Sequence, residues 1–68
     1  MRMTVKQARR FRNITTSKMA DALGISRVTY EKREKNPKQF SIEQIEKISK
    51  IVDVKKENIF FEEEQKEH

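Results

Sequence analysis

Three cations, Arg27, Lys32 and Lys35, recur at a spacing that places them on one face of a helix. At about 100° per residue, a helix over residues 27–35 sets these cations beside Val28. Arg and Lys can donate hydrogen bonds to guanine O6 and N7 in the major groove of DNA, and an apolar side chain can contact a thymine methyl. We therefore expect Arg27, Val28 and Lys32 to read bases, the alternative being an ordinary solvated face.

Glu31 interrupts this cationic face and admits two interpretations. Its carboxylate could accept a hydrogen bond from cytosine N4, or it could pair with Arg27 and Lys35, which lie four residues away on either side. We favour the ion pairs, because a carboxylate close to DNA phosphates is unfavourable unless its charge is matched.

Positive charge is concentrated in the first half of the 68-residue chain. Residues 1–38 hold eleven Lys and Arg against three acidic residues, whereas residues 39–68 hold five against eight. A net charge of +5 and a pI near 9.8 suit a polyanionic partner such as double-stranded DNA. The same charge could also serve only to keep a small domain soluble.

The composition argues against several classes of protein. With no Cys and a single His, the chain offers no evident metal cluster, and we expect no cofactor and no small-molecule ligand. No apolar run approaches the roughly 20 residues that span a bilayer, and no signal peptide is evident, so we expect a cytoplasmic protein without membrane contact. No nucleophile–base pair or phosphate-binding glycine loop is visible either, which argues against an enzyme.

Four helix starts share one pattern: an apolar residue, then Ser or Thr, then three residues and a second apolar residue. The hydroxyl caps the first turn, and the two apolar side chains pack on each other as a hydrophobic staple. The four predicted caps are Thr4, Thr15, Ser26 and Ser41. Gly24 should end the second helix in the left-handed conformation, at a point where a side chain would also clash. Asn36-Pro37 should end the third helix.

The remaining sequence predicts two further helices and a tail. Residues 42–52 repeat Ile at every third position, which is typical of an amphipathic helix. A short fifth helix is expected around residues 55–61, where Ile59 and Phe60 would dock on the others. The sequence thus predicts an all-α, compact five-helix domain over residues 1–61, followed by an acidic, disordered tail over 62–68.

The chain resembles the Cro/C1-type helix-turn-helix family of phage and bacterial repressors. The resemblance lies in two stretches, ITTSKMADALGISRVTYEKRE and SIEQIEKISKIVDVKKENIF, and in the preceding ARR. The resemblance covers residues 5–60. It implies a lambda-repressor-like fold whose second and third helices form the DNA-binding pair, with residues 27–35 as the recognition helix in the major groove. It also implies homodimers bound to two-fold operators, for which Phe11, Ile51 and Phe61 are candidate contacts.

A second set of residues is expected to hold the DNA backbone. The start of the second helix, at Thr16 and Ser17, can direct backbone N–H groups at a phosphate. Matching to the family adds Ser26 and Lys38, and Lys35 lies on the recognition face. The family often has Gln at the position of Thr16, and the shorter Thr retains the phosphate contact but not a base contact.

Matching to the family also pairs Arg9 with Glu34, which would join the first helix to the end of the third. Removing one member of such a pair is costly if the pair is buried. The alternative is two independent surface charges.

The sequence therefore predicts a sequence-specific, double-stranded DNA-binding transcriptional regulator of the phage or bacterial repressor type. Within DNA binding, an antitoxin or a phage-integration accessory protein is the alternative. A different class, a protein-interaction module whose third helix binds an acidic partner, also fits the charge.

Overall fold

Four α-helices and two single turns of 3-10 helix make up most of the described chain, which covers residues 2–60 of a computed structural model. In chain order the elements are β1 (Met3–Thr4), α1 (Val5–Phe11), α2 (Thr16–Leu23), α3 (Arg27–Lys35), η1 (Pro37–Gln39), α4 (Ile42–Val52), η2 (Lys56–Asn58) and β2 (Ile59–Phe60). The predicted all-α class is confirmed. The predicted tail, and Phe61 with it, lies outside the described residues.

All four predicted helix caps are present. Each cap hydroxyl accepts a hydrogen bond of 3.1 Å from the backbone N–H three residues further along. At Thr4 and Ser41 the cap is reciprocal, because the side chains of Gln7 and Gln44 accept from the backbone N–H of the capping residue. These local hydrogen bonds fix where each helix begins.

Three helix ends adopt the left-handed conformation, at Asn13, Gly24 and Asp53. Asn and Asp tolerate a positive φ better than most residues. Gly24 has a φ of 72°, but a Cβ placed on it would meet no atom within 4 Å. The expected clash at Gly24 was therefore wrong, and this glycine is explained by its backbone conformation alone.

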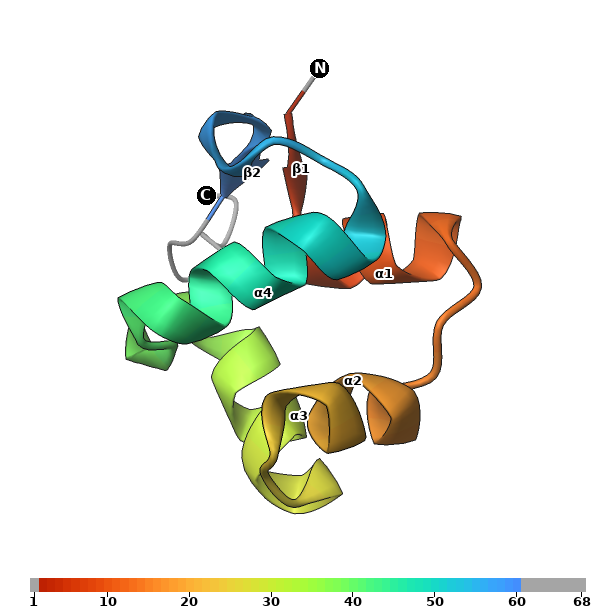
Figure 1. Cartoon of the computed structure of the whole chain (residues 1–68), viewed down its shortest axis with the longest axis vertical. Coiled ribbons are helices and arrows are strands. Elements are labelled where there is room, and N and C mark those ends of the chain that lie inside the picture. Colours follow the sequence, from red (N-terminus) through yellow and green to blue (C-terminus); the bar gives the residue numbers. More distant parts are fainter. Residues whose placement is uncertain (1, 61–68) are drawn as a thin grey trace, which may run out of the picture.

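The core lies where α1, α2, α3 and α4 meet. Its fully buried side chains come from all four helices, with Val5, Met19, Tyr30, Ile48 and Val52 the largest. The Tyr30 ring packs at a tilt against Phe40, with 5.8 Å between the ring centroids. In Figure 1, α2 and α3 lie together at one end of the molecule, and α4 crosses above them. The pair is thus held on a platform made by α1 and α4.

The predicted fifth helix over residues 55–61 is wrong. The chain instead makes one 3-10 turn, η2, and then the two-residue strand β2, which pairs in parallel with β1 so that Met3 lies opposite Ile59. Isoleucine and phenylalanine favour extended backbone, and pairing with the N-terminal segment satisfies backbone groups that a helix would otherwise satisfy locally. Ile59 still docks on the core, where only 3% of its surface is exposed.

Candidate nucleic-acid interface

The turn between α2 and α3 consists of Gly24, Ile25 and Ser26. The Gly24 N–H donates to Asp21 O at 3.1 Å, and the Ile25 N–H donates to Ala20 O at 3.0 Å. Ala20 is almost fully buried, and its small side chain permits the close approach of the two helices. The two helices and the short turn between them therefore form a rigid unit.

The outward face of α3 carries the residues that the sequence assigned to base reading. Arg27, Val28 and Lys32 are all exposed, and Val28 keeps 58% of its surface accessible. The inward face carries Tyr30, which is fully buried, and the half-buried Arg33, which donates to Gln44 Oε1 at 3.1 Å. The structure thus places two cations and an uncovered apolar side chain together on one accessible helix face.

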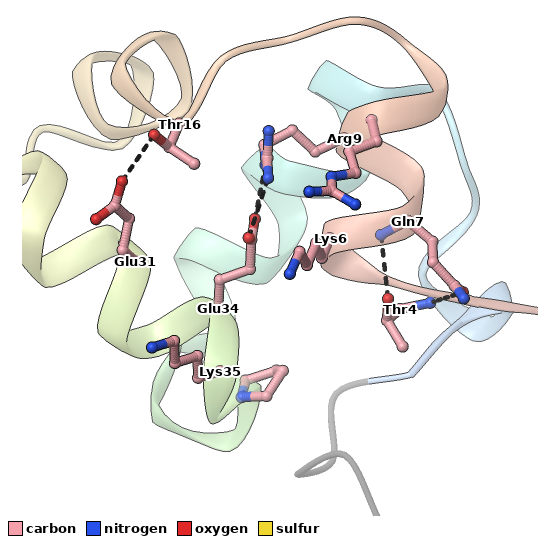
Figure 2. A pocket seen from close by; sticks show the side chains of 10 residues that line it. Thr4, Lys6, Gln7, Arg9, Thr16, Glu31, Glu34 and Lys35 are labelled. Carbon is pink, nitrogen blue, oxygen red and sulfur yellow. Dashed lines mark hydrogen bonds and ion pairs between the residues drawn. The ribbon is translucent and has the colours of Figure 1, made fainter.

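Glu31 lies at the edge of this face and joins α3 to the start of α2. Its Oε2 accepts a hydrogen bond of 3.0 Å from Thr16 Oγ1 and lies 3.8 Å from Arg27 Nε (Figure 2 shows the first contact). The expected pairing with Arg27 is present but long. Within residues 2–60 no ion pair joins Glu31 to Lys35. The sequence reasoning missed Thr16 as a partner, since no periodic signal connects residues 15 positions apart.

The candidate backbone-binding residues surround α3 and the first turn of α2. They are Thr16, which is half-buried, and the exposed Ser17, Ser26, Lys35 and Lys38. The Thr16 hydroxyl is engaged by Glu31 and the Ser26 hydroxyl by Thr29. The backbone N–H groups of Thr16 and Ser17, at the start of α2, have no carbonyl partner within the helix. They are therefore the groups that α2 can offer to a phosphate.

Arg9 and Glu34 form a buried, bidentate ion pair between α1 and α3. Arg9 Nε lies 2.8 Å from Glu34 Oε2 and Arg9 Nη2 lies 3.2 Å from Glu34 Oε1, with side-chain exposures of 10% and 7% (Figure 2). Arg9 Nη1 also donates to Ile14 O at 2.9 Å. One side chain therefore ties α3 both to α1 and to the segment leading into α2.

Tyr30 is a third member of this cluster, which the sequence reasoning did not identify. Its hydroxyl donates to Glu34 Oε2 at 2.6 Å. The hydrogen bond from Arg9 to Glu34 raises the pKa of Arg9 in spite of the burial that opposes it. Burial, reinforced by the hydrogen bond to Glu34, raises the pKa of Tyr30. The spacing of four residues between Tyr30 and Glu34 was the available signal.

A sequence model described as helix-turn-helix matches residues 5–58, from the first residue of α1 to the last residue of η2. The chain belongs to the helix-turn-helix family. The match is to the Cro/C1 type, which confirms the resemblance seen in the sequence. This type is a family of DNA-binding domains of transcription regulators, and it is not a family of enzymes. No match of significance was found among curated proteins, and none among solved structures.

No helix within residues 2–60 has both the length and the apolar character needed to cross a bilayer. The same residues contain no group of three His, Cys, Asp or Glu side chains placed to hold a metal ion.

Proposed function

We propose that this protein is a sequence-specific regulator of the phage or bacterial repressor type, which inserts α3 into the major groove of double-stranded DNA. The observation that carries the proposal is the outward face of α3. Cations there can donate to guanine, and an uncovered Val28 is suited to a thymine methyl. An apolar side chain left 58% exposed between two cations has no role in the core and suits a partner that offers a methyl group.

The residues divide by role according to their position. Arg27 opens α3, and the N-terminal end of a recognition helix enters the groove deepest. Arg27, Val28 and Lys32 therefore read bases. Contacts to phosphates fix the register of the domain on the duplex, and five residues supply them: Thr16, Ser17, Ser26, Lys35 and Lys38.

The size of the recognition helix supports a homodimer. The nine residues of α3 span about 13 Å at 1.5 Å per residue, which is roughly four base pairs at 3.4 Å each. Two copies are needed to specify a longer operator, and two-fold symmetry places the half-sites roughly 34–36 Å apart. Phe11 is a candidate dimer contact, since 68% of its surface is exposed. Ile51 is half-buried and presents less surface.

The regulator would act in the cytoplasm, by occluding a promoter or by recruiting a partner to it. Selection from a library of random duplexes tests the proposal. We expect enrichment of a two-fold motif. The alternative is a module that binds acidic proteins. It would be supported by binding that shows no DNA sequence preference and whose affinity for duplex DNA and for an acidic peptide falls equally as salt rises.

A further inference from the structure

A groove of about 460 Å³ lies between α1 and α3, beside the recognition face. Lys6 and Arg10 line it from α1, and Lys35 lines it from the end of α3. Thr16, the first residue of α2, also lines the groove. In Figure 2, Lys6 extends from α1 toward α3, and Thr16 and Lys35 lie apart along the groove.

Both acidic residues of the groove already have partners within the protein. Glu34 is held by Arg9 and by the Tyr30 hydroxyl, and Glu31 is held by Thr16 and Arg27. Neither carboxylate forms an ion pair with Lys6, Arg10 or Lys35 of the described chain.

The remaining cations of the groove are unmatched. Lys6, Arg10 and Lys35 are exposed, and within residues 2–60 no side-chain hydrogen bond or ion pair engages any of them. Three cations gathered around one groove repel each other, and an anion lying in the groove would relieve that repulsion.

We propose that this groove is a second phosphate-binding surface, in which Lys6 and Arg10 of α1, together with Lys35, hold the sugar–phosphate strand that borders the major groove. The inference rests on the proposed function. A strand that approaches the N–H groups at the start of α2 and also reaches Lys35 must cross the groove that both residues line. The anion is therefore a run of backbone phosphates and not an isolated phosphate ion.

Contacts of this kind carry no sequence information. Each phosphate neutralised by a cation contributes about 0.9 to the slope of log K against log salt concentration. Lys6 and Arg10 should therefore affect the salt dependence of binding and leave the base preference unchanged.

The test compares the double variant Lys6→Gln/Arg10→Gln with a matched control, Lys47→Gln/Lys50→Gln, which removes two exposed charges from α4, outside the groove. The affinity of each protein for the selected operator is measured by titration at about four salt concentrations between roughly 50 and 300 mM, which gives the slope of log K against log salt concentration. We expect the groove variant to reduce the slope by about 1.8, and the control to change it by only a few tenths. The charge-preserving variant Lys6→Arg/Arg10→Lys should restore the parent slope.

Equal slopes for the groove variant and the control would overturn the proposal, because net charge alone would then explain the effect. A changed base preference in the groove variant would overturn it as well. Displacement of DNA by inorganic phosphate at constant ionic strength would show a site for the free ion instead. If the parent selects an operator but the groove variant keeps its slope, only the groove is refuted. A parent without sequence preference would refute the proposed function and the groove with it.

Discussion

Breaking the buried pair of Arg9 and Glu34 should destabilise the protein far more than breaking the exposed pair formed by Arg12, the residue that follows α1. The side chains of Arg9 and Glu34 are only 10% and 7% exposed, whereas those of Arg12 and Asp53, whose closest oppositely charged atoms are 3.6 Å apart, are 39% and 89% exposed. Removing one member of a buried pair leaves an uncompensated charge and costs about 3–5 kcal/mol. An exposed pair contributes about 0.2–1 kcal/mol.

Each single change also leaves other hydrogen-bonding groups of the protein without a partner. Glu34→Ala removes the acceptor of the Tyr30 hydroxyl as well as the Arg9 partner. Arg9→Ala leaves Ile14 O without its donor. We expect each single change to lower the free energy of unfolding by an amount in the upper part of the range for a buried pair. Asp53→Asn is the control, because Asn tolerates the positive φ of that position.

Urea unfolding followed by circular dichroism measures these free energies for the parent, both single variants and the double variant. We expect the loss in the double variant to be well below the sum of the two single losses, since the second change no longer leaves a charge unpaired. A coupling energy near zero, or single losses no larger than that of Asp53→Asn, would refute the buried-pair reasoning. If a single variant is unfolded without urea, Glu34→Gln retains the oxygen that accepts from Tyr30 and permits the same comparison.

Burial raises the pKa of Tyr30, so above about pH 10 the folded state keeps a phenolic proton that the unfolded chain loses. The free energy of unfolding should therefore fall by up to about 1.4 kcal/mol per pH unit above about pH 10. Tyr30→Phe should lack this loss, and an identical alkaline slope in both proteins would contradict it. Operators recovered by selection should have half-site centres roughly 34–36 Å apart, and high-affinity binding of one monomer to a short asymmetric site would argue against the dimer. Unfolding should be cooperative, with a strongly helical circular dichroism spectrum that a chelator leaves unchanged; a loss of helix on adding EDTA would reveal a metal requirement.

Local signals in the sequence account for most of the fold. Each helix start was predictable because the cap hydroxyl and the N–H it accepts from lie three residues apart, as at Ser26 and Thr29. The burial of Tyr30 agrees with helical periodicity, which places it on the face of α3 opposite Arg27 and Lys32. The fifth helix failed because β2 depends on pairing with β1, and Met3 and Ile59 lie at opposite ends of the described chain.

The candidate site was less accessible to the same reasoning. The outward face of α3 could be derived from spacing, but the pairing of Arg9 with Glu34 came from the family resemblance, since the two residues are 25 positions apart. The hydrogen bond from Thr16 to Glu31 and the groove beside it depend on the angle at which α2 and α3 meet α1. That angle is fixed by core packing, which a single sequence does not specify.

Whether the outward face of α3 reads bases can be decided by one random-duplex selection that compares the operator preferences of Arg27→Ala, Lys38→Ala and the parent. Arg27 opens α3, whereas Lys38 lies in η1 after the recognition helix has ended. We predict that Arg27→Ala costs about 1–3 kcal/mol and relaxes the preference at one base pair of each half-site. Lys38→Ala should weaken all sequences alike and lower the salt slope by about 0.9. An unchanged preference in the Arg27 variant, or an altered preference in the Lys38 variant, would contradict this account of the interface.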